Sequence, residues 1–246
     1  MICWGATMFR LNPKKAELEN HFFQKKVRAL LPLLTFLIAL SLVMCKETES
    51  KPDRDSLPYF LGKDFDPVWT KDPGVMESLK QIPEGFQLTN HSGHPYRWKD
   101  HPKPVSLVVF FYATCRGICP LITKNIIQIQ PELAEFPDLE IHSISINPKE
   151  DTPSVLSNYR KLYKIQNPNW FFHTGEVEVI ESFAKTTCGA EVEGFSLEKN
   201  KYEFVHTENI FLFDGKNYLR GIYRAKGTGD IQRLVADLRL LTKKQN

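Results

Sequence analysis

The chain has 246 residues, of which 42% are hydrophobic and 25% are charged, as is typical of a globular protein. Its formal net charge is only +3, and the sequence has no basic stripe interleaved with aromatic residues, so nucleic-acid binding is disfavoured. The five cysteines form an odd, sparse set, which argues against a disulfide-stapled scaffold and for cysteines with individual roles.

The N-terminal region predicts attachment to a membrane. Several lysines, among them Lys25 and Lys26, precede an apolar run over residues 29–45, and charge returns at Lys46. A basic flank followed by an apolar core is typical of a secretory signal or of an anchor with its N-terminus inside. The run is at or just below the ~20 residues of a spanning helix. We therefore expect residues 1–45 to be a signal, lipoprotein or transmembrane anchor.

Two features of this region leave alternatives open. Residues 42–45 resemble a bacterial lipobox with a lipidated Cys45, although Met44 stands where a small residue is preferred, and translation could start at Met8 instead of Met1. Residues 46–56 are polar and charged without periodicity, which predicts a solvated tether. We expect the domain to occupy residues 57–246 and to begin with an aromatic, irregular extension packed against it.

The remaining sequence predicts alternating strands and helices. The apolar run over 107–112 lacks alternation, as is typical of a strand covered on both faces. Proline suits the first turn of a helix, so helices should begin at Pro120 and after Thr152. In order, we expect a hairpin over 86–98, a strand over 105–112, a helix over 120–131, an alternating strand over 140–146, a helix from 153, a strand over 170–173, a helix over 176–186, a hairpin over 210–223 and a last helix capped by Asp230. This order predicts an α/β domain with a mixed central sheet.

Cys115 and Cys119 lie between the buried strand and the first long helix. The helix N-terminus near Cys119 and the charge of Arg116 predict lowered thiol pKa values, and thiolates are the reactive and metal-binding form. Burial in the core is one alternative, and structural zinc is another, although zinc requires four ligands and no second pair of this type exists. Two thiolates with one imidazole favour Cu(I) and can also hold Cu(II).

Seven histidines are candidates for the third ligand. We expect His91, His94 and His101, in polar and turn-like stretches, to be exposed. His142 falls on the alternating strand and His173 beside a turn. Each of them alone is more often a surface or core residue than a ligand.

Four motifs make a family resemblance specific. CRGICP, SINPKEDTP from Ser145, WFFHTG from Trp170 and VHTENIFLFDGK from Val205 occur in the order and approximate spacing of the Sco/SenC family, which the chain resembles from about Leu57 to its C-terminus. The resemblance implies a thioredoxin-like fold, held at a bacterial membrane on its periplasmic or extracytoplasmic side. It also implies one copper ion bound by Cys115, Cys119 and His206.

The implied role is that of a metallochaperone rather than an enzyme. It would deliver copper to the binuclear copper site of cytochrome c oxidase subunit II, or maintain the thiols of that site. Some positions depart from the family pattern: Asn147 and Val205 each stand where aspartate is common, and Arg116-Gly117 replaces Pro-Asp. These changes should favour thiolates and affect partner docking and redox poise more than metal binding.

Two other functions stay open from the sequence. One is a membrane-attached thiol–disulfide oxidoreductase with Cys115 and Cys119 as its redox pair. The other is a copper or redox sensor. The absence of any proline after Pro168 disfavours a general oxidoreductase, since thioredoxin-like enzymes usually carry a proline facing the cysteines late in the domain. For Cys188 we expect a buried or incidental thiol, and the copper oxidation state and oligomeric state are not determined by the sequence.

Overall fold

A seven-stranded mixed sheet forms the centre of the described chain. The computed structural model describes residues 56–101, 105–190, 192–197, 201–206 and 208–243, with the backbone alone for 192–206. Strands β5, β6 and β7 are parallel neighbours, and the other strands pair antiparallel. The strand order is β11 (Leu219–Arg224), β10 (Asn209–Phe213), β5 (Ser106–Phe111), β6 (Glu140–Ser145), β7 (Trp170–Thr174), β3 (Gln87–Asn90) and β4 (Pro95–Arg97). The predicted α/β class with a mixed sheet is confirmed.

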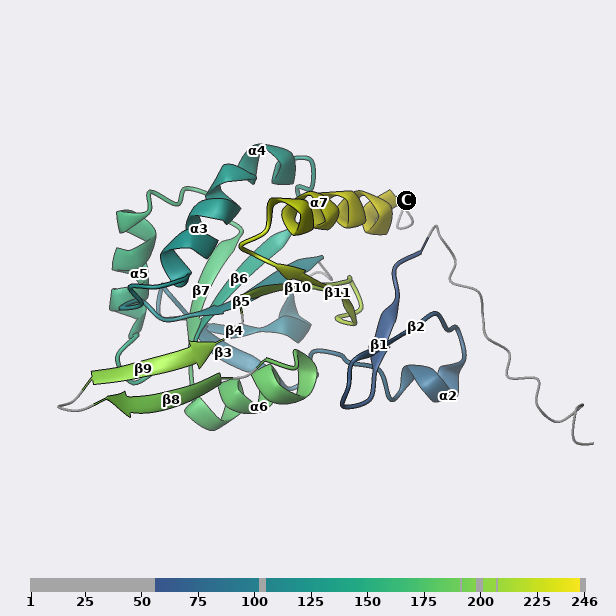
Figure 1. Cartoon of the computed structure of the whole chain (residues 1–246), viewed down its shortest axis with the longest axis horizontal. Helices are drawn as coiled ribbons and strands as arrows, with labels where there is room; N and C mark the ends of the chain where they lie inside the picture. The colour runs from purple at the N-terminus through teal and green to yellow at the C-terminus, as the bar shows by residue number, and fades with distance from the viewer. Residues whose placement is uncertain (1–55, 102–104, 191, 198–200, 207, 244–246) are drawn as a thin grey trace, which may run out of the picture. The chain divides into compact units, whose positions relative to one another are not determined.

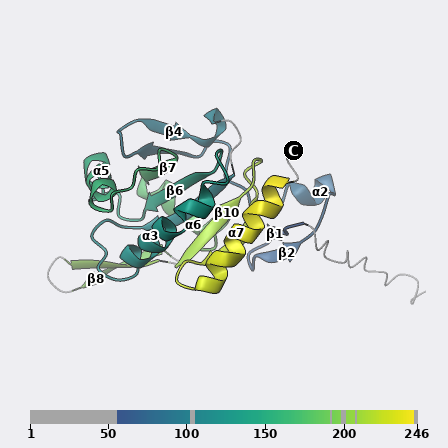
Figure 2. The same ribbon diagram turned by 90° about the horizontal axis from the view of Figure 1, so that it is seen from above.

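Helices cover both faces of this sheet. They are α3 (Cys119–Gln128), α4 (Gln130–Leu133), α5 (Pro153–Leu162), α6 (Val177–Thr187) and α7 (Thr228–Lys243). Figure 1 shows α3, α4 and α7 above the sheet and α6 below it, and Figure 2 views the same arrangement from above. The side chain of Tyr159 in α5 bonds that of Thr123 in α3, so α5 shares the face of α3. None of the helices in the described ranges is long and apolar enough to cross a membrane, and the anchor expected over 1–45 lies outside those ranges.

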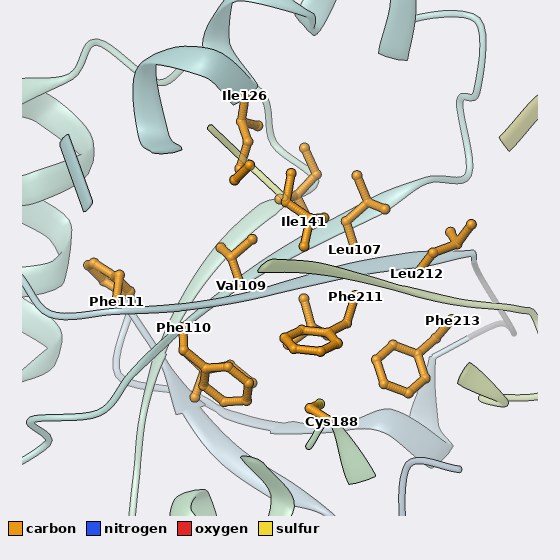
Figure 3. Close-up of a cluster of buried hydrophobic side chains, with 14 of the residues drawn as sticks. Leu107, Val109, Phe110, Phe111, Ile126, Ile141, Cys188, Phe211, Leu212 and Phe213 are labelled. Atoms are coloured by element: carbon orange, nitrogen blue, oxygen red, sulfur yellow. The ribbon is translucent and has the colours of Figure 1, made fainter. Parts of the chain in front are cut away.

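β5 is buried along its whole length, as the unbroken apolar run predicts. Its side chains alternate between the two faces of the sheet. In Figure 3, Val109 points toward Ile126 of α3, whereas Phe110 points to the other side, together with Phe211 and Cys188. Packing on both faces fixes the strand that leads into the cysteine loop.

The predicted hairpins are present, and the structure adds a third. β3 pairs with β4, and β10 pairs with β11. The third consists of β8 (Val192–Leu197) and β9 (Lys201–His206) in an antiparallel ribbon. Alternating apolar and polar residues around the polar stretch at 198–200 were the available signal, but we expected no element there.

The extension before the sheet is more regular than expected. It contains a two-stranded ribbon, β1 (Tyr59–Leu61) with β2 (Asp66–Val68), and a short helix α2 (Pro73–Met76). Arg220 fixes its beginning: the guanidinium donates to the carbonyl of Leu57 at 2.6 Å and to that of Pro58 at 2.9 Å. The same group bonds Asp214 at 2.8 Å and lies 3.9 Å from the Tyr59 ring centroid. The extension therefore packs on the domain, as predicted.

Four local expectations need correction. The helix expected over 120–131 is divided into α3 and α4, the strand β6 is buried almost throughout rather than alternating, and a 3-10 turn, η1 (Trp98–Asp100), follows β4. Asp230 is not the cap of α7, because the helix begins at Thr228. Its carboxylate instead accepts a hydrogen bond from the backbone N–H of Arg224 at 3.1 Å.

Candidate metal centre

The cysteine loop connects the C-terminal end of β5 to the first turn of α3. Cys115 lies in the loop and is half-buried, whereas Cys119 is the first residue of α3 and is 0% exposed. Pro120 occupies the first turn, where its missing N–H is tolerated. The backbone N–H of Cys115 donates to the carbonyl of Tyr112 at 3.2 Å, which turns the chain after the strand. A fixed strand and a helix start thus carry the two thiols.

The two thiols contact each other, and neither forms a disulfide. The hydrogen bond with Cys115 and the burial of the side chain raise the pKa of the Cys119 thiol well above its usual range. Backbone hydrogen bonds at Tyr112 and at Cys119 itself act to lower this pKa, as a helix start predicts, but their effect is smaller. For Cys119 the prediction of a lowered pKa was therefore wrong.

The physical reason is that the hydrogen bond with Cys115, and after it the loss of water around the buried sulfur, favour the protonated form of Cys119. Negative charge on one sulfur disfavours ionisation of the other, and an apolar surrounding adds to this effect. A bound soft cation reverses it, because a metal ion deprotonates the thiols that coordinate it. Two adjacent sulfur donors fit copper by this criterion.

The third expected ligand, His206, is the last residue of β9, and its side chain lies outside the described side chains. Its backbone precedes β10, whose residue Ile210 pairs antiparallel with Val109 of β5. The start of β10 is therefore beside the end of β5, the edge that carries the cysteine loop. Among the side chains that the structure describes, no three His, Cys, Asp or Glu residues are grouped to hold a metal ion.

The connection between β6 and α5 borders the cysteine loop. The carboxylate of Asp151 accepts hydrogen bonds from the backbone N–H of Ala113 at 2.9 Å and from Ser145 Oγ at 2.5 Å. Burial raises the pKa of Asp151. On α5, the buried Tyr159 hydroxyl lies 3.0 Å from Thr123 Oγ1 and close enough to Cys119 for the two groups to influence each other electrostatically. Ser145 and Asp151 belong to the SINPKEDTP motif, and Tyr159 belongs to the helix that follows it.

Asn147, which departs from the family pattern, has a structural place in this connection. Its backbone N–H donates to Ser145 Oγ at 3.0 Å, and its carbonyl accepts from the N–H groups of Glu150 and Asp151. The turn at Asn147 is therefore formed by the backbone. A second departure, Val205, lies outside the described side chains.

The described histidines are buried more often than we expected. His94 is exposed as predicted, but His91 and His101 are only partly exposed. His91 accepts a hydrogen bond from the backbone N–H of Phe172 at 3.3 Å, and burial lowers its pKa to about 4. The prediction of three exposed histidines was wrong for these two, because β3 pairs with β7 next to His91, and the ring of His101 stacks on that of Tyr96.

His142 and His173 form a fully buried pair on neighbouring strands. Nδ1 of His142 and Nε2 of His173 are 3.0 Å apart, and burial lowers the pKa of both rings. His142 Nε2 also lies 3.5 Å from the Glu140 carboxylate. The groups around the pair are Tyr96 from β4, Trp98 from η1, Phe171 from β7, Glu140 from β6, and His91 and His101 at longer range. Neither histidine belongs to the cysteine site.

Cys188 is buried at the C-terminal end of α6, and burial raises its pKa well above the usual range. It faces Phe110 and Phe213, on the side of the sheet opposite Ile126 of α3 (Figure 3). This agrees with the expectation of a buried thiol without a role in the site.

Comparison with known families shows to which family the chain belongs. Residues 75–243 match the family model of SCO1/SenC. The chain belongs to the SCO1/SenC family. The matched region contains Cys115, Cys119 and His206 together with all four motifs quoted above.

Solved Sco structures are similar over most of the domain. A SCO1/SenC family lipoprotein from Bacillus anthracis has a TM-score of 0.60 at 25% identity, covering 66% of this chain and 96% of its own. BsSco, in which a disulfide switch has been identified, has a TM-score of 0.58 at 26% identity, with 71% and 98% covered, and is a member of the Sco family of cytochrome c oxidase assembly proteins. Bradyrhizobium japonicum ScoI, solved with copper bound, has a TM-score of 0.54 at 23% identity, with 63% and 96% covered. These similarities confirm the thioredoxin-like Sco fold of this chain.

Proposed function

We propose that this protein is a copper metallochaperone that holds one copper ion through Cys115, Cys119 and His206. The observation that carries the proposal is the contact between two thiols, not joined in a disulfide, at the end of a buried strand; one thiol is half-buried and the other is fully buried. Copper bound to a solved Sco relative supports the choice of metal. The position of β9 before β10 supports His206 as the ligand that completes the set.

Copper leaves such a site by exchange of ligands. An acceptor thiolate reaches Cys115 first, because Cys119 is enclosed by the start of α3 and the core. The acceptor replaces Cys115 on the metal, a second acceptor group replaces His206, and Cys119 is released last and regains its proton. No electrons are transferred in this sequence, and each sulfur that leaves the metal takes up one proton at neutral pH.

Copper titration of the full chain in detergent tests the ligand set. Wild-type protein should take up about one copper ion, the number expected for a single soft-ligand site. Cys115→Ser and Cys119→Ser should each abolish tight binding, and His206→Ala should weaken it.

Two residues provide matched controls for this titration. Cys188→Ala removes a buried thiol away from the site, and His94→Ala removes an exposed histidine from the β3–β4 turn. Both variants should bind copper as the wild type does. Wild-type affinity in His206→Ala would remove that residue from the ligand set, and failure of the wild-type chain to bind copper would refute the metallochaperone.

For the acceptor, we propose the binuclear copper site of cytochrome c oxidase subunit II. Family membership supports this choice, since BsSco belongs to a family of proteins that assemble that oxidase. The basic flank and apolar run of residues 1–45, together with a lipoprotein among the solved relatives, support attachment to the extracytoplasmic side of a bacterial membrane. A strain lacking this protein should assemble oxidase with less copper, and restored copper content should require Cys115 and Cys119.

The disulfide switch of BsSco favours a second function, reduction of the acceptor's thiols. Cys115 as thiolate attacks an acceptor disulfide, one acceptor thiol leaves, and a mixed disulfide forms. Cys119 then attacks Cys115, which releases the second acceptor thiol and leaves a Cys115–Cys119 disulfide, so the acceptor gains two electrons and two protons. A further thiol reductant must reset the pair. Fast reduction of an acceptor disulfide by copper-free protein would favour this function over copper delivery.

A further inference from the structure

A buried carboxylate links the cysteine loop to the neighbouring strand. Asp151 is 0% exposed, and its Oδ2 atom accepts from the N–H of Ala113 at 2.9 Å and from Ser145 Oγ at 2.5 Å. Ala113 precedes Cys115 by two positions, and Ser145 is the last residue of β6. One oxygen atom therefore joins the loop that carries Cys115 to a strand of the central sheet.

Asp151 is itself held firmly in place. Its backbone N–H donates to the carbonyl of Asn147 at 3.0 Å, and the N–H of Asn147 returns a hydrogen bond to Ser145 Oγ at 3.0 Å. The next residue, Thr152, is the N-cap of α5. The turn at Asn147 precedes Asp151 and α5 follows it, so the position of the carboxylate is fixed. A fixed carboxylate can in turn determine where the N–H of Ala113 lies.

Asp151 is not buried at this position in order to cap α5. Thr152 is the cap residue, and its hydroxyl accepts from the N–H of Val155 at 3.4 Å. The two groups that donate to Oδ2 of Asp151 belong instead to the ends of β5 and β6, and its second oxygen, Oδ1, is buried without a hydrogen-bond partner among the described atoms. Burying an oxygen without a hydrogen-bond partner costs free energy, and α5 already has Thr152 as its cap. The start of α5 therefore gives no reason for a buried carboxylate at position 151.

We propose that Asp151 is a positioning residue for Cys115, acting through the N–H of Ala113 to hold the loop where the Cys115 sulfur meets Cys119. The proposal rests on the function assigned above to the cysteine pair, and Asp151 is not a ligand. Groups one step removed from a metal site orient its ligands and typically change metal affinity 10–100-fold when they are replaced.

Three variants separate this role from general stability. Asp151→Ala removes the acceptor for Ala113 and should lower copper affinity by about tenfold or more. Asp151→Asn keeps an oxygen that can accept the same two hydrogen bonds, so it should restore most of the affinity. Ser145→Ala removes a second donor to the carboxylate while leaving the bond to Ala113 intact, so it should reduce stability but not copper affinity.

A copper-free readout keeps the test independent of the metallochaperone function. The alkylation rate of Cys115 by iodoacetamide, measured in folded protein by mass spectrometry of the modified peptide, should rise in Asp151→Ala and return toward the wild-type rate in Asp151→Asn. If wild-type protein binds no copper, the metallochaperone fails, but the alkylation rates still decide the role of Asp151.

Folding of each variant is checked by near-ultraviolet circular dichroism. If Asp151→Ala does not fold, Asp151→Glu replaces it, because the longer side chain keeps the carboxylate but moves its oxygens relative to Ala113. A folded Ala or Glu variant with wild-type copper affinity and wild-type Cys115 alkylation would overturn the proposal. An Asn variant as impaired as the Ala variant would overturn it as well, since the effect would then depend on charge instead of the hydrogen bond.

Discussion

Cys115 and Cys119 are adjacent in space but differ in their surroundings. Cys115 is half-buried in a loop, whereas Cys119 is fully buried at a helix start and its pKa is raised by the hydrogen bond with Cys115 and by burial. Access and ionisation both control the rate at which a thiol reacts. For the proposed function we therefore expect Cys115 to meet the partner first and Cys119 to retain the metal or to resolve a mixed disulfide.

The first prediction concerns this difference. At neutral pH, iodoacetamide should modify Cys115 of the copper-free protein before Cys119 and Cys188, because a buried thiol with a raised pKa offers little accessible thiolate. Peptide mapping by mass spectrometry at successive times measures the order. Modification of Cys119 or Cys188 ahead of Cys115 in folded protein would contradict the exposures described here.

At this scale, the sequence identified the cysteine pair but not its electrostatics. The spacing of Cys115 and Cys119 before Pro120 placed both thiols between a strand and a helix, and the structure agrees. The raised pKa of Cys119 depends on how closely its sulfur approaches Cys115, which spacing along the chain does not specify. The buried bond between Asp151 and Ala113 was hidden for the same reason, because it joins residues 38 positions apart.

Neighbouring strands β6 and β7 each contribute one histidine to the buried pair of His142 and His173. Both pKa values are lowered by burial, so the folded protein keeps the rings neutral at a pH where the unfolded chain, with a pKa near 6.5, is protonated. Stability should therefore be unaffected by this pair above about pH 6.5 and should fall below it. The loss can reach about 1.4 kcal/mol per pH unit for each histidine that only the unfolded chain protonates.

The second prediction follows from this linkage. The free energy of unfolding, measured by urea titration between about pH 7 and pH 5.5, above the range where most carboxylates titrate, should decrease steeply in the wild type. His142→Leu together with His173→Leu should reduce the slope. His94→Ala, which removes an exposed histidine, is the control and should keep the wild-type slope. An unchanged slope in the double variant would assign the acid sensitivity to other groups.

Helix α6 supports the sheet from the face opposite the cysteine loop. Its residue Phe183 stacks on Phe86 with ring centroids 4.2 Å apart and packs near Phe110 and Phe213. The third prediction is that Phe183→Ala lowers the free energy of unfolding by about 3–5 kcal/mol while copper affinity stays unchanged. Val179→Ala, at a position that is 40% exposed on the same helix, should have little effect on either quantity. Loss of copper affinity in a folded Phe183→Ala protein would contradict this prediction, because copper binding would then depend on packing at the opposite face of the sheet.

Elements with strong local signals were predicted well. A continuous apolar run identified β5, and alternation of residue types identified β6, although that strand is buried almost throughout. Proline at helix starts identified α3 and α5, and the Asp214-Gly215 turn identified the β10–β11 hairpin. The β8–β9 hairpin was missed because its strands carry a weak alternation interrupted by Gly194 and Ser196. The ribbon of β1 and β2 was missed because its stability comes from packing on the domain, including the guanidinium of Arg220, and short isolated strands carry little signal.

For the whole molecule, copper binding should couple to both folding and protonation. A ligand that binds only the folded state stabilises it, by about 2.7 kcal/mol at a free concentration 100 times the Kd. Because the pKa of Cys119 is raised in the copper-free protein, copper must displace the proton of this thiol, so apparent affinity should fall as pH falls.

The fourth prediction tests this coupling. Copper loading should raise the Tm of wild-type protein and leave that of Cys115→Ser unchanged. The apparent Kd, measured by competition with a chelator of known affinity, should change by about tenfold per pH unit for each proton released. A copper affinity that does not vary with pH would mean that the thiols are already ionised in the metal-free protein.

Arg220 holds the start of the domain at one end of the central sheet. Leu219 pairs with Phe213, and Phe213 with Ser106, so the carbonyls of Leu57 and Pro58 are bound where β5 begins, whereas the cysteine loop lies where β5 ends. Figures 1 and 2 both show β1 and the start of α3 toward opposite ends of the sheet. Six residues of strand separate the two ends by roughly 17–20 Å. Any force transmitted along the chain from the N-terminal side is therefore received by Arg220 and Asp214 where β5 begins, at a distance from the half-buried Cys115 where β5 ends.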